Sequence, residues 1–178
     1  MTYKESLTAA MTTLGRDPQV RFVGYGVRYG GRAAGTLRGV APAQCIETPV
    51  AENLMASLAI GLALRGLRPV VYFERYDFIL NALDAIVNHL DKLEPISGGE
   101  FNPAVILRVV AGNTAKPLFT GATHTQNFTA ALRKLVRFPI EELPTASGIS
   151  SAYACAYAGW RKSGYQTSTL LVEFKDLI

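Results

Sequence analysis

The sequence predicts an α/β fold, a three-layer α/β/α sandwich built around a mainly parallel sheet. Short apolar segments typical of strands alternate along the chain with segments of helical periodicity, and this alternation favours a parallel sheet covered by helices on both faces. Residues 104–110 form a mostly apolar run of the kind that parallel sheets bury on both faces. The 178 residues, 49% hydrophobic and 18% charged, suit one compact domain over residues 1–178.

The N-terminal part is predicted to hold a helix, a strand and a long loop. Apolar residues recur at helical spacing over residues 4–15, and Gly15 ends the pattern. A first strand is predicted over residues 20–24. Residues 25–42 contain five glycines among basic residues, which predicts a flexible surface loop. A phosphate cradle in this loop is the less favoured alternative, because no phosphate-binding signature is present.

A long apolar helix is predicted after residue 48. Thr48 is the expected N-cap, Pro49 suits the first helical position, and Gly66 suits the position just past the end. Residues 54–64 are apolar on nearly every side of the helix. We therefore expect the helix to be buried all round, in the protein interior or in an interface.

An isolated acidic residue, Glu52, lies near the start of this helix. A buried carboxylate is costly unless it is protonated or hydrogen-bonded. The positive end of the helix dipole favours the anion, whereas apolar surroundings favour the neutral acid. A group balanced in this way can share a proton with a ligand. The open alternative is that Glu52 makes only a capping contact to N–H groups of the first turn.

The remaining elements continue the alternation of strands and helices. The predicted strands are residues 69–73, residues 104–110, a strand that begins at Val136, and residues 169–174; the predicted helices are residues 78–93, a short helix before Val136, and residues 146–161. In open parallel sheets, ligands bind beyond the carboxyl ends of the strands. The loops to search for a site are therefore residues 25–42, 47–52, 74–78 and 111–126.

Composition and charge argue against several classes of protein. The net charge of +4 is modest and the basic residues are scattered, which disfavours nucleic-acid binding. The longest apolar run is about half the length of a membrane helix, and the N-terminus lacks the apolar stretch of a signal peptide. We therefore expect a cytoplasmic protein without a membrane span. Cys45 and Cys155 stand alone, so we expect buried thiols rather than a disulfide or a zinc site.

Five segments occur in an order that matches a known family. They are residues 47–52, 61–69, 77–84, 92–99 and 121–126, and they include Glu-Thr-Pro-Val-Ala-Glu, Asp-Phe and Gly-Ala-Thr-His-Thr-Gln. In this series the chain resembles the pyrimidine-binding domain of thiamine diphosphate-dependent enzymes. The resemblance is closest to the β subunits of 2-oxoacid dehydrogenase decarboxylating components, and transketolase is a more distant relative.

The resemblance implies roles for individual residues. Glu52 matches the glutamate that hydrogen-bonds ring N1′ of the cofactor's aminopyrimidine, a contact that promotes formation of the nucleophilic ylid at thiazolium C2. Phe78 matches the aromatic residue that stacks on the pyrimidine, and Tyr76 and Tyr72 are neighbours expected to line the same pocket. His124 matches a histidine near the substrate carbonyl, where an imidazole can stabilise a developing alkoxide or transfer a proton.

The family's diphosphate-binding sequence is absent from this chain. Family members hold Mg²⁺ and the diphosphate with a Gly-Asp-Gly segment and a later Asn-Asn pair, and no Gly-Asp-Gly occurs here. The resemblance therefore implies a partner subunit that holds Mg²⁺, in an α2β2-type heterotetramer, while this chain supplies no metal ligand. Family β subunits also continue into a C-terminal domain that these 178 residues lack, and they carry acidic residues where this chain has Tyr25 and Gly26.

The predicted function is that of the pyrimidine-binding subunit of a two-component thiamine diphosphate-dependent enzyme. Such an enzyme decarboxylates a 2-oxo acid, or transfers an acyl or ketol group from a 2-oxo acid or ketose. The alternative is a non-catalytic scaffold or regulatory subunit that pairs with an active thiamine diphosphate-binding homologue. A third hypothesis is a nucleotide-binding protein that uses the glycine-rich loop. Glu52 favours the enzyme hypothesis, because a scaffold has no need of a costly buried acid. The other histidine of the chain, His89, is expected to be structural.

Overall fold

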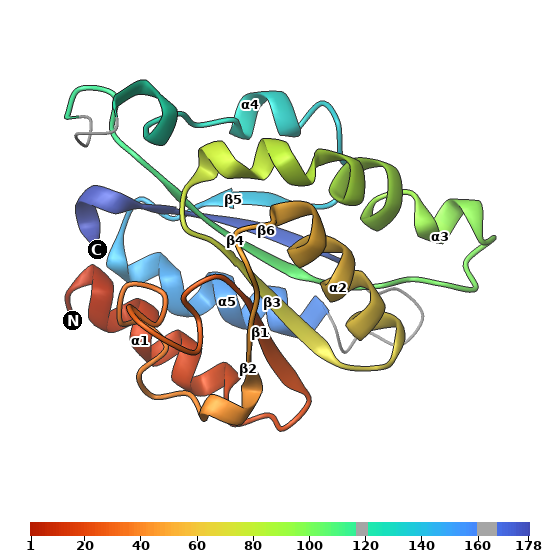
Figure 1. The fold of residues 1–178 in the computed structure, drawn as a ribbon, viewed down its shortest axis with the longest axis horizontal. Helices are drawn as coiled ribbons and strands as arrows, with labels where there is room; N and C mark the ends of the chain where they lie inside the picture. The colour runs from red at the N-terminus through yellow and green to blue at the C-terminus, as the bar shows by residue number, and fades with distance from the viewer. Residues whose placement is uncertain (117–120, 160–166) are drawn as a thin grey trace.

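The computed structural model describes residues 1–116, 121–159 and 167–178. Within these residues a six-stranded sheet forms the centre of the molecule (Figure 1), and each pair of neighbouring strands is parallel. The predicted parallel α/β sheet is therefore confirmed. The strand order is β2-β1-β3-β4-β6-β5, with β1 (Val20–Gly24), β2 (Cys45–Glu47), β3 (Arg68–Phe73), β4 (Ile106–Ala111), β5 (Ile140–Glu142) and β6 (Thr169–Phe174).

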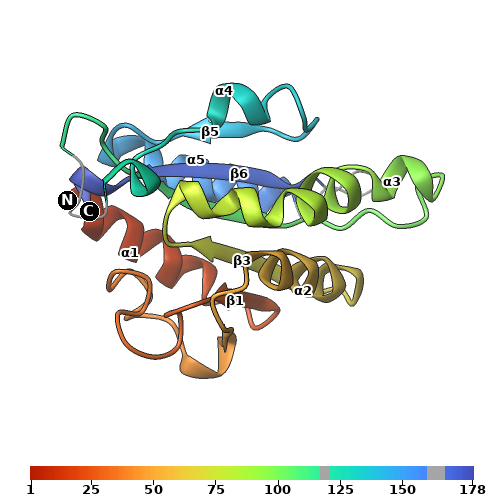
Figure 2. The ribbon, with the colours of Figure 1, turned by 45° about the horizontal axis from the view of Figure 1, so that its top comes forward.

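Helices cover both faces of the sheet, so the fold has the three layers expected from the sequence (Figure 2). One face carries α1 (Tyr3–Leu14) and α5 (Ala146–Gly159), which pack side by side. The other face carries α2 (Glu52–Leu64), the 3₁₀ helix η2 (Tyr76–Ala82) and the π-helix η3 (Asp84–Leu90). The shorter helices are η1 (Pro42–Gln44), α3 (Leu93–Ile96), η4 (Gly121–His124), α4 (Thr129–Leu132) and η5 (Lys175–Leu177).

Each face of the sheet supports its own hydrophobic core, because side chains alternate along every strand. In β3, Val70 and Tyr72 belong to the core beneath α1 and α5, whereas Val71 and Phe73 belong to the core beneath α2. β4 is buried along its whole length. Because the strands are parallel, the loops after β1, β3 and β4 all leave from the same edge of the sheet.

The carboxyl end of α2 forms as the sequence predicted. The N–H of Gly66 donates to the C=O of Ala63, and the N–H of Leu67 donates to the C=O of Leu62, which together make a Schellman motif. Gly66 takes a φ of 80°, in the left-handed region that favours glycine. The helix that carries Glu52 is therefore stopped by a local sequence signal.

The rest of α2 differs from the prediction. The helix starts at Glu52 rather than just after Thr48, with Ala51 at the N-cap and no side-chain cap. The helix is not buried on all sides within this chain, because Leu54 is 48% exposed and Leu64 is 44% exposed. Burial of this exposed side in an interface, the other alternative expected from the sequence, stays a prediction. α2 packs against the sheet along one side only, so its apolar outer side stays open in this chain.

Two other elements also differ from the prediction. The helix expected over residues 78–93 forms as η2, η3 and α3, a succession of 3₁₀, π and short α segments rather than one regular α-helix. The strand expected from Val136 begins at Ile140 instead, because a turn after α4 occupies the intervening residues. Four residues at helical spacing in the first of these segments were expected on one face: Ala82, Ile86 and Leu90 are buried in the core, and Leu93 is partly buried against it.

The remaining sequence expectations have mixed outcomes. Cys45 is a buried free thiol as expected, whereas Cys155 is free but exposed. The helix predicted over residues 146–161 is described as far as Gly159, and the last two of those positions lie outside the described residues. Among the helices that the structure describes, none is long and apolar enough to cross a membrane.

Candidate functional site

Glu52 occupies the first position of α2 and is only 7% exposed. The first N–H groups of a helix lack intrahelical partners and the helix dipole is positive there, so this position favours an anion. Thr48 does not provide the predicted cap. Its N–H donates to the C=O of Gly24, and its buried hydroxyl oxygen has no hydrogen-bond partner in the described part of the chain. The buried acid predicted from the sequence is therefore present, at the very start of the helix.

Asn81 supports Glu52 from the neighbouring helix η2. Nδ2 of Asn81 donates to Oε2 of Glu52 at 3.2 Å, and the described residues make no other side-chain hydrogen bond to this carboxyl group. A carboxylate can accept about four hydrogen bonds. Glu52 therefore keeps most of its acceptor capacity, including all of that of Oε1, for a ligand. The sequence motif contained Asn81, but nothing in its spacing indicated this contact.

Phe78 and His124 lie together, and Phe78 belongs to η2, the helix that also carries Asn81. η2 follows β3, and His124 ends η4, which follows β4. The two rings meet edge to face, with centroids 5.1 Å apart and an interplanar angle of 86°. Both side chains are half-buried, so each keeps a surface open to a ligand. The topology explains the meeting, because β3 and β4 are neighbours in the sheet.

The segment that carries His124 is held between β4 and η2. A Cβ at Gly112 would lie 2.1 Å from the C=O oxygen of His124 and 2.7 Å from the Cα of Thr125, so only glycine permits this approach to the end of β4. On the other side, Oδ1 of Asp77 accepts from Nε2 of Gln126 at 2.9 Å. The sequence motifs contained these residues, but their contacts emerged only in the fold.

Tyr76, which was expected to line the cofactor pocket, is fully buried in the core on this side of the sheet. Its hydroxyl shares a hydrogen bond of 3.3 Å with Oγ1 of Thr129, and its ring meets Phe128 edge to face at 6.0 Å. Burial raises the pKa of Tyr76 to about 12, so the hydroxyl stays protonated. Its role beside the cofactor remains a prediction.

Tyr72 faces the opposite side of the sheet, so it does not share a pocket with Phe78. Its ring lies in the core beneath α1 and α5, with the guanidinium carbon of Arg108 at 4.9 Å from the ring centroid. Alternation along β3 places Tyr72 on that face. The expectation that Tyr72 lines the same pocket as Phe78 is therefore wrong.

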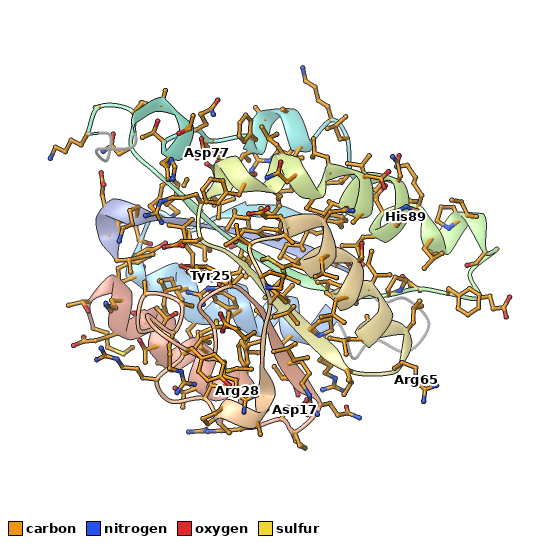
Figure 3. All side chains as sticks on the ribbon, viewed as in Figure 1. Asp17, Tyr25, Arg28, Arg65, Asp77 and His89 are labelled. Carbon is orange, nitrogen blue, oxygen red and sulfur yellow. The ribbon has the colours of Figure 1, made fainter. Side chains whose placement is uncertain are left out.

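His89, the second histidine of the chain, lies away from this site. Figure 3 shows His89 and Asp77 toward opposite ends of the η2–η3 segment. The His89 side chain is 61% exposed, and its Nε2 lies 3.5 Å from a carboxyl oxygen of Asp84. His89 therefore lies at the surface, and its expected structural role stays a prediction.

The glycine-rich loop is organised by Glu47 rather than left open for a phosphate. One carboxyl oxygen of Glu47 accepts from the N–H of Gly26 at 2.5 Å, and the other accepts from the N–H groups of Arg28 at 2.7 Å and Tyr29 at 3.3 Å. A phosphate cradle needs such N–H groups free. Their occupation by a carboxyl group counts against the nucleotide-binding hypothesis.

The same loop is more tightly packed than the sequence analysis expected. Val27, Ala33, Leu37 and Val40 are buried and join the core beneath α1 and α5. The expectation of an exposed surface loop over residues 25–42 is therefore wrong in this respect. Apolar residues between the glycines fold the loop back onto the sheet, and the glycine count alone does not reveal this.

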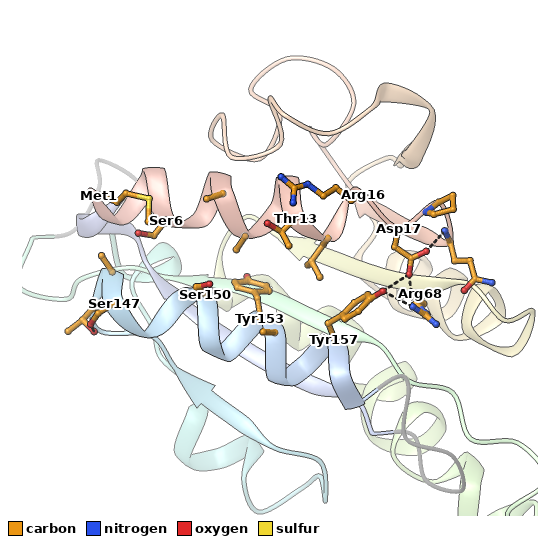
Figure 4. Close-up of a pocket in the computed structure, with 18 residues that line it drawn as sticks. Met1, Ser6, Thr13, Arg16, Asp17, Arg68, Ser147, Ser150, Tyr153 and Tyr157 are labelled. Carbon is orange, nitrogen blue, oxygen red and sulfur yellow. Dashed lines mark hydrogen bonds and ion pairs between the residues drawn. The ribbon is translucent and has the colours of Figure 1, made fainter.

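A large cleft of about 1060 Å³ lies between α1 and α5, on the face of the sheet opposite to α2 (Figure 4). Half of the residues that line it are Ser, Thr or Ala. At one end Asp17 and Arg68 form an ion pair at 2.5 Å, and the hydroxyl of Tyr157 donates to Asp17 at 2.8 Å. The side chains of Asp17, Arg68 and Tyr157 therefore satisfy one another at this end of the cleft.

The site fits one half of thiamine diphosphate. Glu52 offers a carboxyl oxygen to a ring nitrogen, and Phe78 offers an aromatic surface beside the imidazole of His124. Among residues 1–116, 121–159 and 167–178, no group of three or more His, Cys, Asp and Glu side chains is arranged to hold a metal ion. The carboxyl group of Glu52 and the ring of Phe78 have the chemistry that an aminopyrimidine ring requires.

Sequence comparison places these features in a family. No protein-family model matches the chain. The chain is 36% identical over 135 residues to the pyruvate dehydrogenase E1 component subunit beta of Rickettsia conorii, and 34% identical over 134 residues to the mitochondrial subunit beta of Saccharomyces cerevisiae. These matches cover 73% and 72% of this chain but only 40% and 36% of the relatives. The chain thus spans about two fifths of the length of these relatives.

Comparison with solved structures agrees on the fold. A structure described as a split gene transketolase, inactive β4 tetramer, superposes on this chain with a TM-score of 0.73. The superposition covers 98% of this chain and 52% of that one, at 15% sequence identity. The chain therefore has the fold of this transketolase structure, and its sequence identity to the relatives above shows that it belongs to the family of pyruvate dehydrogenase E1 component β subunits.

Proposed function

We propose that this chain is the pyrimidine-binding subunit of a two-component thiamine diphosphate-dependent enzyme that decarboxylates a 2-oxo acid or transfers an acyl or ketol group. The observation that carries the proposal is the buried carboxyl group of Glu52, with Oε2 held by Asn81 and Oε1 available. The E1 β relatives support a 2-oxo acid as the substrate class. When bound, thiamine diphosphate supplies the carbon nucleophile of the reaction.

Glu52 would bind N1′ of the aminopyrimidine and hold a proton at that atom. The hydrogen bond from Asn81 fixes Oε2, which orients the carboxyl group and leaves Oε1 for the cofactor. Met55 and Ala56, on the next turn of α2, are 2% exposed and keep water away from the buried side of the acid. In such low-dielectric surroundings a hydrogen bond to a ring nitrogen is stronger than it is in water.

Phe78 and His124 would serve the pyrimidine and the substrate respectively. The half-buried ring of Phe78 offers a stacking surface, and Tyr76 is buried in the core on the same side of the sheet. The imidazole of His124 can donate a hydrogen bond to a developing oxyanion or transfer a proton to it. Its Nδ1 lies 3.0 Å from the hydroxyl oxygen of Thr123, so that contact influences which ring nitrogen carries the proton.

The outer side of α2 supports the proposal of a partner subunit. Leu54 and Leu64 are about half exposed on this side, and a Cβ at Gly61 would meet no atom within 4 Å. An exposed apolar helix face is a surface that a second protein can cover. We place here the subunit that holds Mg²⁺ and the diphosphate, in an α2β2-type assembly.

Substitution of Gly61 tests this docking face. Gly61→Arg is expected to abolish assembly with a subunit that carries the Gly-Asp-Gly and Asn-Asn segments, because the new side chain fills the open face. Gly61→Ala is the matched control, which should leave assembly intact and stabilise α2 by about 0.5–1 kcal/mol. Analytical ultracentrifugation of the mixed subunits measures the outcome. Normal assembly of Gly61→Arg would place the partner elsewhere.

Cofactor binding tests the function itself. We expect the isolated chain to bind thiamine diphosphate weakly or not at all in the presence of Mg²⁺, and binding to appear once the partner is added. The reason is that no Gly-Asp-Gly segment is present to hold the diphosphate through Mg²⁺. Isothermal titration calorimetry measures both cases. Micromolar binding by the chain alone would contradict the division of the cofactor between two subunits.

The non-catalytic alternative makes a different prediction for the same complex. A scaffold or regulatory subunit would assemble with its partner but would leave cofactor affinity and turnover unchanged when Glu52 is replaced. The replacement of the family's acidic residues by Tyr25 and Gly26 is the feature that favours this alternative. Loss of turnover in Glu52→Gln with assembly retained would exclude it.

A further inference from the structure

The turn that carries His124 is fastened to the rest of the site by Asp77. Oδ1 of Asp77 accepts a hydrogen bond from Nε2 of Gln126 at 2.9 Å and a longer one from the N–H of Gln126 at 3.4 Å. Gln126 follows His124 by two residues, so these bonds fix the turn on its C-terminal side. The ring of His124 contacts Phe78, the residue next to Asp77.

The carboxyl group of Asp77 is buried and only half satisfied. The residue is 7% exposed, and its second oxygen, Oδ2, is buried without a partner among the residues that the structure describes. An unsatisfied buried acceptor destabilises a fold. Asparagine has nearly the same shape, and its Oδ1 would accept the same two hydrogen bonds. We therefore expect the acceptor Oδ1, which asparagine retains, to be sufficient to hold Gln126.

We infer that Asp77 is a positioning residue, which sets the place of the His124 imidazole beside Phe78 by binding Gln126. The catalytic meaning of this placement rests on the proposed function, whereas the placement itself does not. Gly112 holds the turn against β4 on its other side. Loss of the Asp77 contact frees the turn from η2, the helix that carries Phe78, so the ring of His124 can leave the edge of Phe78.

Proton NMR of the histidine Hε1 atoms tests the inference on the chain alone. The sequence contains two histidines, and His89, near the far end of the η2–η3 segment (Figure 3), provides an internal reference. In Asp77→Ala and in Gln126→Ala, we expect the His124 signal to move toward that of His89, because the ring current of Phe78 is lost. In Asp77→Asn we expect the signal to stay.

Two results would overturn the inference. One is an unchanged His124 signal in both Asp77→Ala and Gln126→Ala. The other is a shift in Asp77→Asn as large as the shift in Asp77→Ala. Gln126 is exposed, so Gln126→Ala keeps the test available if Asp77→Ala does not fold. The His89 signal reports in each variant whether the helical segment retains its structure.

Turnover of the assembled enzyme separates this inference from the proposed function. Asp77→Ala is expected to slow substrate turnover by on the order of tenfold to a hundredfold, as small displacements of a catalytic group do, whereas Asp77→Asn retains turnover. A moved His124 signal with normal turnover would uphold the positioning by Asp77 and refute the proposed role of His124. An unmoved signal refutes the positioning, whatever the turnover.

Discussion

Two buried acidic residues lie on opposite faces of the sheet and differ in how their oxygens are satisfied. Glu173, on β6, is fully buried and accepts from Nε of Arg108 at 2.6 Å, from its terminal nitrogen NH2 at 2.9 Å and from the hydroxyl of Tyr153 at 2.5 Å. Glu52 accepts one side-chain hydrogen bond, from Asn81. Both oxygens of the first carboxylate are bonded within the fold, whereas one oxygen of the second stays available for a ligand.

The surroundings of Glu173 keep Arg108 charged and Tyr153 protonated. Burial alone would lower the pKa of Arg108, but the carboxylate of Glu173 raises it above the usual range. Burial raises the pKa of Tyr153 far above its ordinary value, and Glu173 adds to the rise, so the hydroxyl remains a donor. Burial of an acid is therefore not by itself a sign of function; unused acceptor capacity is the better sign.

The same chemical change on the two faces should give opposite results. Glu52→Gln is expected to slow exchange of the thiamine diphosphate C2 proton in the assembled complex by about 10²–10⁴-fold, because the amide cannot deliver a proton to N1′. Its free energy of unfolding should stay close to that of the unsubstituted chain. Glu141→Gln, at an exposed position on β5, is the control for the substitution itself. Near-normal C2 exchange in Glu52→Gln would show that Glu52 does not deliver a proton to N1′.

Glu173→Gln should instead damage the fold. The substitution leaves the guanidinium of Arg108 buried without its counter-charge, and loss of one partner of a buried pair costs about 3–5 kcal/mol. The double variant Arg108→Met with Glu173→Leu should recover much of this loss, because no charge then remains buried. Urea unfolding followed by circular dichroism measures both. Equal stability of Glu173→Gln and the unsubstituted chain would show that the fold does not depend on the charge of Glu173.

His124→Ala is expected to affect the substrate step and not the cofactor step. Loss of one positioned donor to a developing oxyanion slows turnover by about 10²–10³-fold. C2 proton exchange, which depends on Glu52, should stay unchanged in the same variant complex. Parallel loss of both activities, or of neither, would make His124 a structural residue and direct the search for the substrate site to residues 25–41.

Asn81→Ala should have the smallest effect of the four. It removes the hydrogen bond that orients Glu52, and a hydrogen bond to a charged group contributes about 1.5–3 kcal/mol at most. Because Asn81 is exposed, we expect C2 exchange to slow by only about tenfold or less. Asn88→Ala is the matched control, because Nδ2 of Asn88 donates to a carboxyl oxygen of Asp84 at 2.8 Å on an exposed surface. Equal rates in both variants would show that Glu52 orients itself without Asn81.

Several features of the fold and of the candidate site could be predicted from the sequence alone. The alternation of apolar strands and helical segments specified the parallel three-layer fold, because both patterns are local properties of the chain. Gly66 specified the end of α2 through its left-handed backbone conformation. The position of Glu52 at the start of an apolar helix marked it as an unusual acid before its surroundings were known.

The tertiary structure decided which groups meet. Asn81 reaches Glu52, and His124 reaches Phe78, because the parallel order brings the segments after separate strands to one edge of the sheet. Arg108 stands within a run that reads as a buried apolar strand, and only the neighbouring β6 reveals why an arginine is tolerated there. Local sequence determines the spacing of apolar residues in each helix or strand and the residues at which it ends. Pairings between residues far apart in the chain depend on strand order and register, which no local pattern encodes.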